Sequence, residues 1–398
     1  MISLSLTCAT LFVVIIIIIR HRLPQGLSER ERDSLGVTAR ILELKKLQSA
    51  LDELSSKSRR KKFTAEQVTA RVSALASSRK AGGDHHQTAT GVSLKHADLS
   101  GEWLCGLDLH DAKLNHSVLD NANLSGSNLS RADMSGVQAI EVDLDHANLE
   151  SAILRDSTLR ASSMQGARFN KADLSRCDMS NVSASEADFS GASMAEVDLS
   201  HSDIDRSKMA GADLRGAKLP REMVEVDMSS ANLSETDLQG RKMTRCVMRG
   251  ARLASNDLRG IDLSSCDVRE ADLRTNISAT VLPRNLQGVN LSGVDLHGRD
   301  LSGHDLSGAN LSNISLSNTN LSNANLSNAN LSNTSLPRNL QGVNLSGVNL
   351  HGRDLAGHDL SNANLSNTNL SNANLSNTIL PRNLQGVNLS GVNLHGRD

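Results

Sequence analysis

The sequence predicts an all-β solenoid that follows a transmembrane helix and short α-helices. Three observations predict the solenoid. A large apolar residue recurs every five positions from Leu94 and continues without a break to Leu219. A smaller residue, most often Ala, Val or Ser, lies two positions before most of the large ones. Only 1% of the 398 residues are aromatic, which is too few for an ordinary globular core. A period fixed over so long a span is typical of a solenoid.

The charges divide the chain into regions. Residues 20–80 hold 15 Lys and Arg against 7 Asp and Glu, a net of +8, whereas the remaining residues hold 27 against 37, a net of −10. We expect a transmembrane signal anchor at 1–20, a basic α-helical juxtamembrane region and linker at 21–87, and the repeat solenoid at 88–398. This asymmetry is more informative than the overall net charge of −2.

The first region is expected to cross a membrane. Residues 1–19 carry no charge, and a helix of that length spans roughly 28 Å, which matches a bilayer core of about 30 Å. A cleaved signal peptide and a buried strand are the alternatives. The basic residues Arg20 and Arg22 follow the apolar run, and no small-residue cleavage site comes after it. The positive-inside rule then predicts a single-pass membrane protein whose repeat region is cytoplasmic.

The juxtamembrane region is expected to hold two amphipathic helices. The first has apolar residues at three- and four-residue spacing from Val37 to Leu54, about two and a half heptads, which favours a helix packed on the body over a coiled coil. Thr64 and Gln67 resemble a capping box at the start of the second helix. Residues 82–86, with a Gly pair and a His pair, are interpreted as a linker.

A basic cluster separates these two helices and consists of Arg59, Arg60, Lys61 and Lys62. Beside a membrane anchor, we interpret it as a contact with anionic lipid. A solvated helix end is an equally good interpretation, and a nuclear-localisation-like run is a further one.

The five-residue spacing has a direct structural meaning. We call the large apolar residue position i. In an extended chain, positions i−2 and i point to one side and i−1 to the other, so each unit buries a small and a large residue and exposes an Asx. A helix is excluded because five is not a multiple of 3.6. The core residues predicted by this pattern include Leu94, Leu99, Leu104, Leu109, Leu114, Leu119, Leu124, Leu129, Phe169 and Phe189.

The repeated unit, as in Ala122-Asn123-Leu124-Ser125-Gly126, resembles the A(D/N)LXX unit of the pentapeptide-repeat family. The resemblance covers about 91–398. It implies a right-handed quadrilateral β-helix in which four pentapeptides form one square coil. The number of repeats then predicts about 15 coils, stacked roughly 4.8 Å apart.

The register slips by one residue at five places, four of which contain a proline. Proline cannot donate a ladder hydrogen bond, so we expect four-residue sides or small kinks there. The register-break prolines are Pro220, Pro283, Pro337 and Pro381, and the fifth slip lies between Leu273 and Ile277.

Four charged or titratable residues occupy inward i−2 positions in the last third of the chain: Arg299, His304, Arg353 and His358. A buried unpaired Arg is costly, so these sides are expected to bulge or to let the side chain escape. The same third is rich in Asn, which predicts stacked hydrogen-bonded Asn ladders.

The two ends of the solenoid are expected to differ. Glu102 and Leu107 replace small i−2 residues beside Trp103, which predicts a first coil covered by the preceding helices. The sequence stops at Asp398 in mid-repeat. An uncapped edge there invites an end-to-end homodimer, and an incomplete gene product is the alternative.

The repeat favours no enzyme. No Ser/His/Asp set stands out, and neither GxGxxG nor GxxxxGK[ST] occurs. The cysteines have no CxxC and no paired spacing, so the spacing supports neither a disulfide framework nor a zinc site. The inward thiols of Cys177, Cys246 and Cys266 are interpreted as small core residues. No cofactor or metal is expected.

The leading hypothesis is a non-enzymatic, membrane-anchored scaffold that presents a polar rod to an unknown protein partner. The alternative is an acidic DNA mimic that binds a topoisomerase such as gyrase, as the family members linked to quinolone resistance do. Residues 91–282 carry a net charge of −9, but their basic residues are interspersed and would break up an acidic stripe. A secreted or lumenal binding protein is the second alternative, and nucleic acid itself is not an expected partner.

Overall fold

The computed structural model describes residues 61–71 and 91–394. The chain divides into two compact units, Met1–Lys61 and Lys62–Asp398, and nearly all described residues belong to the second. The predicted anchor at 1–20, the first amphipathic helix, Arg59 and Arg60 lie outside the described residues. Within the described part of the chain, no helix combines the length and the apolar character that crossing a bilayer requires.

Regular strands are few and short because each side of a coil has only five residues. They are β1 (Lys61–Lys62), β2 (Ala97–Asp98), β3 (Glu222–Val224) and β4 (Lys242–Thr244). β1 pairs with β2, and β3 pairs with β4 in parallel. Elsewhere among the described residues the ladder consists of single parallel bridges. The expected helical end at Lys61 and Lys62 is wrong, because these two residues form a strand.

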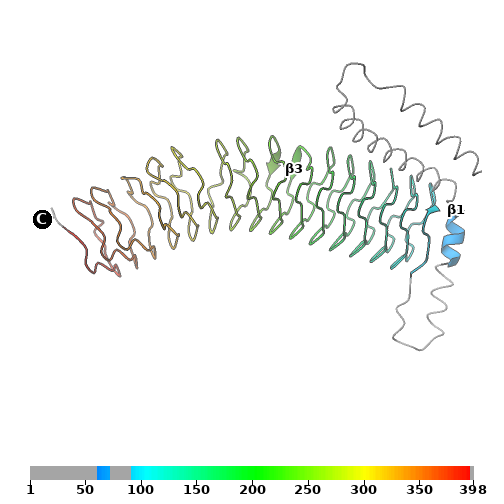
Figure 1. The fold of residues 1–398 in the computed structure, drawn as a ribbon, viewed down its shortest axis with the longest axis horizontal. Helices are drawn as coiled ribbons and strands as arrows, with labels where there is room; N and C mark the ends of the chain where they lie inside the picture. Colours follow the sequence, from blue (N-terminus) through cyan, green and yellow to red (C-terminus); the bar gives the residue numbers. More distant parts are fainter. Residues whose placement is uncertain (1–60, 72–90, 395–398) are drawn as a thin grey trace, which may run out of the picture. The chain divides into compact units, whose positions relative to one another are not determined.

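The coils stack by bridging residues that lie one full turn apart. Asp98 bridges Val118, and Asn123 bridges Asp143, each 20 positions further along, so one coil contains four units. The backbone follows the same rule, since Leu99 N donates to Val118 O at 2.8 Å. Figure 1 shows the resulting coils side by side through the repeat region.

Each corner of a coil is a tight turn. Ala97 N donates to Leu94 O at 3.1 Å, and His96, two residues after the large apolar residue, has a φ of 54°. A positive φ at the third residue is what a type II turn requires. From Asn313 to Asn377, every non-glycine corner residue with positive φ is Asn. Asn is one of the side chains that best tolerates this conformation.

The core is a set of columns of apolar side chains, one from each coil. Phe169 and Phe189, one coil apart, stack with ring centroids 5.0 Å apart and planes inclined by 12°. Aromatic pairs at this separation add to the stability that burial itself supplies. The ten core residues predicted from the spacing are each at most 1% exposed; they are Leu94, Leu99, Leu104, Leu109, Leu114, Leu119, Leu124, Leu129, Phe169 and Phe189.

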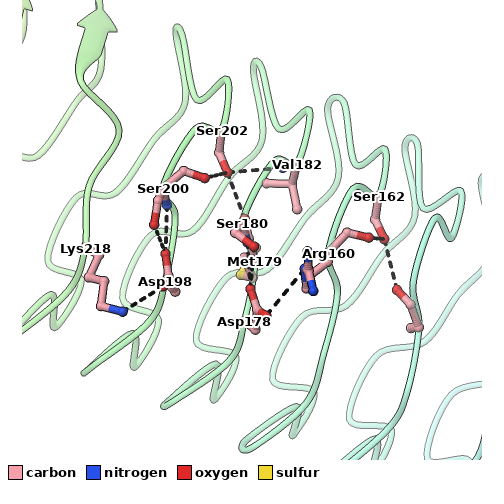
Figure 2. A network of polar contacts seen from close by, with 11 residues as sticks. Arg160, Ser162, Asp178, Met179, Ser180, Val182, Asp198, Ser200, Ser202 and Lys218 are labelled. Atoms are coloured by element: carbon pink, nitrogen blue, oxygen red, sulfur yellow. Dashed lines mark hydrogen bonds and ion pairs between the residues drawn. The ribbon is translucent and has the colours of Figure 1, made fainter.

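Polar residues at inward positions complete the turns of the preceding coil. The Ser202 hydroxyl donates to Met179 O at 2.8 Å and accepts from Val182 N at 3.1 Å (Figure 2). Thr236 donates to Leu214 O in the same way. Buried hydroxyls are tolerated when they are hydrogen-bonded, so a polar i−2 residue fits wherever a turn carbonyl is available.

At the register breaks the ladder continues with shorter coils. Bridges join residues 19 apart on either side of Pro220, as in Lys208 to Asp227. The same shortening occurs on either side of Pro337 and Pro381, and two breaks together reduce the spacing to 18 between Asp272 and Asn290. All four prolines are buried, whereas the arginine after each is exposed: Arg221, Arg284, Arg338 and Arg382.

The inward arginines of the last third are half-buried and hydrogen-bonded. Arg299 Nη1 donates to Thr280 O at 2.8 Å, and Arg353 donates to Thr334 O. Burial lowers the pKa of both guanidinium groups. The sequence predicted that these sides would bulge or let the side chain reach solvent. Instead, both arginines donate hydrogen bonds to carbonyl oxygens of the preceding coil. His304 and His358 also contact carbonyl oxygens, at 3.1 and 3.3 Å.

The second predicted helix begins with the expected capping box. Thr64 N donates to the Gln67 side chain at 3.2 Å, and Gln67 N donates to the Thr64 hydroxyl at 3.4 Å. Residues 65–71 are helical, and Val68 is fully buried in the core. The reciprocal bonds satisfy two of the free N–H groups at the helix start.

This helix covers the first coil. Ala65 N donates to the Glu102 carboxylate at 2.6 Å, and Phe63 N donates to Asp98 O at 3.1 Å. Arg71 Nη1 donates to Ser93 O at 3.3 Å. The Glu102 carboxylate thus accepts a hydrogen bond from the first turn of the helix, which explains a large charged residue at this i−2 position. The helix covers the open edge of the first coil.

Replacing Phe169 with Ala should lower the free energy of unfolding by about 3–5 kcal/mol, because it leaves a cavity in a dry column. The matched control is Trp103→Ala, since Trp103 is 73% exposed and should change stability by less than about 0.5 kcal/mol. Urea unfolding followed by circular dichroism measures both. Equal losses in the two variants would contradict the assignment of the core.

Candidate interaction surface

Each coil has four outward faces, which we call A, B, C and D after the sides that begin at Leu94, Leu99, Leu104 and Leu109. A face consists of the residues at i−1 and i+1 on that side. The bridges assign each residue to its face: face C begins at Trp103, continues through Asn123 and Asp143, and ends at Ile379. No group of three or more metal-ligating side chains occurs among the described residues.

Most outward Asp and Asn residues have a structural role. In a typical unit, Asn123 Oδ1 accepts hydrogen bonds from Ser125 N at 2.9 Å and from the Ser125 hydroxyl at 2.6 Å. The same i−1 to i+1 bond recurs in many units on all four faces, as at Asp98 and Asp133. Such local bonds are the reason that Asx residues favour turns.

In the last third, the Asn side chains also form ladders along the stack. Asn310 Nδ2 donates to Asn290 Oδ1, and Asn330 Nδ2 donates to Asn310 Oδ1, both at 3.1 Å. Asn333 donates to Asn313 at the corner at the same distance. The predicted Asn ladders are confirmed.

On faces A and B, basic residues neutralise neighbouring carboxylates. Lys218 Nζ lies 2.9 Å from Asp198, and Arg160 lies 3.7 Å from Asp178, both on face B (Figure 2). On face A, Arg215 pairs with Asp213 at 2.7 Å. Exposed pairs of this kind contribute little stability, but they cancel charge locally. The Lys and Arg residues on faces A, B and D are Lys95, Lys113, Arg155, Arg160, Arg168, Lys208, Arg215, Lys218, Arg249, Arg252, Arg259, Arg269 and Arg274.

Face C differs from the other three in its charge. Among its described outward residues, Lys242 is the single Lys or Arg, and it lies 3.9 Å from Glu222. The exposed Arg221 and Arg338 lie at one border of the face, and the exposed Arg206, Arg245, Arg284 and Arg382 lie at the other. The acidic residues on face C are Asp143, Asp145, Asp203, Asp205, Glu222, Asp262, Asp300 and Asp359.

Neutral donors hold the carboxylates of face C. Asp203 accepts from the Ser185 hydroxyl at 2.8 Å, and Asp143 accepts from Asn123 Nδ2 at 3.0 Å. Hydrogen bonds from the side chain and backbone of Ser264 lower the pKa of Asp262. Hydrogen bonds from serines likewise lower the pKa of Asp300 and Asp359. Serine and asparagine donors, rather than Lys or Arg, therefore hold these carboxylates of face C.

Large apolar side chains are also exposed on face C. Trp103, Val281 and Ile379 are 73%, 51% and 56% exposed. All three occupy i−1, the position that Asp or Asn usually takes. The one other large apolar residue that is exposed in the described region is Leu394, an inward position i residue on the B side. Face C therefore combines acidic side chains with separate exposed apolar side chains.

The structure separates the remaining sequence-predicted site residues. Lys61 and Lys62 of the basic cluster are exposed in β1, and the four register-break prolines are buried at the borders of face C. Sequence reasoning missed the segregation of charge, because it counted acidic and basic residues together. The available signal was the spacing of 20 residues, which places Asp143, Ser163, Ser183 and Asp203 on one face.

Comparison with protein families gives one match. The family of pentapeptide repeats matches residues 108–145, 143–181, 185–219, 231–274, 285–313, 300–338 and 339–380. These segments cover more than half of the chain. No curated protein matches it.

Several solved structures are similar to parts of the chain. HetL, a pentapeptide repeat protein involved in heterocyst differentiation in the cyanobacterium Nostoc sp., is 25% identical, with 69% of this chain and 94% of HetL covered and a TM-score of 0.21. QnrB1, a plasmid-mediated fluoroquinolone resistance protein, is 16% identical, with 48% and 88% covered and a TM-score of 0.34. A pentapeptide repeat protein from the Arabidopsis thaliana thylakoid lumen is 22% identical, with 24% and 65% covered and a TM-score of 0.15.

Replacing Asp262, Asp300 and Asp359 together with Asn should weaken the acid sensitivity of the fold. Asn retains the oxygen that accepts the serine N–H but lacks the charge, so the variant should be slightly less stable than the wild type at pH 7. The folded pKa of each Asp is lowered from 3.8, the value in the unfolded chain. The ionised carboxylates therefore stabilise the fold above the unfolded pKa. This stabilisation is lost as the pH falls through the folded pKa.

Urea midpoints between about pH 5 and pH 3 measure this effect. The wild type should lose more stability than the Asn variant over that range. Replacement of the same residues with Ala is the control, because it removes the acceptor and should destabilise at both pH values. Parallel pH profiles for the wild type and the Asn variant would contradict the role of these carboxylates.

Proposed function

Because this chain belongs to the pentapeptide-repeat family, we propose that it is a non-enzymatic interaction rod whose face C binds a basic protein partner. The family is generally structural or interactive rather than catalytic, and it implies a right-handed β-helix. The rod of about 15 coils that the repeat number predicts would extend the face over several tens of ångströms.

The observation that carries this proposal is the uncompensated charge of face C. Among the described residues, face C holds eight acidic residues and the single Lys242, whereas the other 13 outward Lys and Arg residues lie on faces A, B and D. An acidic surface of this kind steers a basic partner and fixes its register. The exposed Trp103, Val281 and Ile379 add apolar contacts on the same face.

Membrane anchoring is the second part of the proposal. The uncharged residues 1–19 and the flanking Arg20 and Arg22 support a single-pass anchor with the rod on the cytoplasmic side. The basic residues 59–62 would then lie near anionic lipid. Anchoring would hold face C at a constant distance from the membrane and present it to partners there.

Mimicry of duplex DNA is the alternative, and face C favours it more than the whole-chain charge did. The charge density decides between the two. With eight acidic residues and one Lys on about 15 coils, face C has roughly one net negative charge per 10 Å along the stack, against about one per 1.7 Å in duplex DNA. A surface with so low a charge density suits a partner with a few spaced basic residues better than a topoisomerase groove that binds DNA.

The binding proposal is tested with a lysine-rich peptide and two matched variants. One carries Asp143→Asn, Asp203→Asn, Asp262→Asn and Asp300→Asn on face C. The control carries Asp178→Asn, Asp198→Asn, Asp257→Asn and Asp295→Asn on face B. Both change the net charge equally, and Asn keeps the turn-closing oxygen in each.

Fluorescence anisotropy should report at least a tenfold weaker affinity for the face C variant and less than a twofold change for the control, with the difference shrinking as salt increases. Equal weakening of both variants would mean that net charge, rather than face C, governs binding. That result would overturn the proposal.

Inhibition of gyrase supercoiling by residues 62–398 tests the alternative. The interaction-rod proposal expects no inhibition at micromolar concentration. Inhibition that the face C substitutions abolish would establish DNA mimicry in its place.

Protease protection and carbonate extraction of membranes from cells expressing the C-terminally tagged chain test the anchor. We expect the tag to stay with the membrane and to be digested from the cytoplasmic side. A chain cleaved near residue 20 and soluble across the membrane would instead indicate the second alternative, a secreted or lumenal binding protein.

A further inference from the structure

Two cysteines occupy neighbouring positions inside the solenoid. Cys246 and Cys266 are i−2 residues on the D side of consecutive coils, and the residues that follow them, Val247 and Asp267, bridge in parallel. Asp267 N donates to Cys246 O at 3.0 Å, which holds the two coils in register at this point. Neither thiol has a role in the interaction surface described above.

The geometry brings the two side chains together. In-register parallel neighbours have Cα atoms about 4.8 Å apart, inside the range of about 4.4–6.8 Å found for disulfides. The thiols have equivalent surroundings, since Cys246 Sγ donates to Met223 O at 3.5 Å and Cys266 Sγ donates to Met243 O at 3.6 Å. Both side chains therefore point the same way into the interior, one above the other.

The two thiols also differ in a way that suits reaction with each other. A hydrogen bond from Cys246 lowers the pKa of the Cys266 thiol, and the same interaction together with burial raises the pKa of Cys246. Cys266 is 5% exposed, whereas Cys246 is fully buried. The thiol nearer to solvent is thus the one that ionises more easily, which is the property of an attacking cysteine.

The other described cysteines lack this arrangement. Cys177 is buried, but Ser157 and Val197 occupy the equivalent positions in the coils on either side. Burial raises the pKa of Cys177 to about 12, so it is unreactive. Cys105 is exposed on face C and follows Trp103, with Ser125 at the equivalent position in the next coil. These two cysteines serve as internal controls.

We propose that Cys246 and Cys266 are a modification site that hydrogen peroxide converts to a disulfide joining two coils. The Cys266 thiolate attacks one peroxide oxygen, forming a sulfenic acid and releasing hydroxide, which takes up a proton to become water. The Cys246 sulfur then attacks the sulfenic sulfur, the S–S bond forms, and a second water leaves. Two thiols lose two electrons and two protons, and one peroxide is reduced to two waters.

The disulfide would covalently link two consecutive coils in the middle of the stack. Each coil is otherwise held to the next by backbone bonds and side-chain packing alone, and a solenoid can unfold from any point along its length. A covalent link between consecutive coils restricts the unfolded chain and raises resistance to denaturant.

The test treats the folded full-length protein with hydrogen peroxide, blocks the remaining thiols with iodoacetamide in denaturant, and analyses peptides by mass spectrometry. We expect a cross-linked pair containing Cys246 and Cys266, two hydrogen atoms lighter than the sum of the reduced peptides, in more than half of the molecules. Cys177 should be alkylated in full, and Cys105 should be oxidised without an intramolecular partner.

Cys246→Ser and Cys266→Ser should each abolish the cross-link, and Cys177→Ser should leave it unchanged. Peroxide should raise the urea midpoint of the wild type and of Cys177→Ser but not of the other two variants. Alkylation of Cys246 and Cys266 in a sample whose Cys105 is oxidised would overturn the proposal. Cross-links that include Cys177 would also overturn it, because they would indicate reaction of unfolded chains.

Discussion

The pairing of each coil with the next at a fixed 20-residue register is the constraint on which the rest of the structure depends. A five-residue side has too few hydrogen bonds to be stable alone, so every coil exists only as part of the stack. This register brings residues at equivalent positions of consecutive coils into contact, which produces the Phe169–Phe189 stack and the Asn290–Asn310–Asn330 ladder. The register breaks follow the same constraint, because a buried proline shortens one side and the ladder resumes with every column intact.

This constraint also decides what the outward residues can do. An Asp or Asn at i−1 already closes its own turn, so its abundance alone does not indicate a binding site. What differs between faces is the identity of the neighbours. Lys218 and Arg215 neutralise carboxylates on faces B and A, whereas Asp203 and Asp262 on face C accept hydrogen bonds from serines. Function on a solenoid thus depends on which residues share a column rather than on overall composition.

The core could be predicted from the sequence because its period is local: positions i−2 and i point inward in any extended five-residue unit. The capping box at Thr64 was equally local. The charge of face C and the pairing of Cys246 with Cys266 were missed, because both depend on coil length, which relates residues 20 apart. The hydrogen bonds of Arg299 and Arg353 could not be predicted, since they need the position of a carbonyl in the preceding coil. The strand at Lys61–Lys62 replaced an expected helix end because it adds to the edge of the first coil.

The central claim is that partners contact face C and leave the other faces free. The most direct measurement is photo-crosslinking in cells, with a photoreactive phenylalanine derivative placed at Ser183 on face C or at Ser193 on face A, two serines that lie two units apart along the chain. We predict a discrete cross-linked product from position 183 and none from position 193. Products of equal yield from both positions, or a product from position 193 alone, would contradict the assignment of face C as the interaction surface.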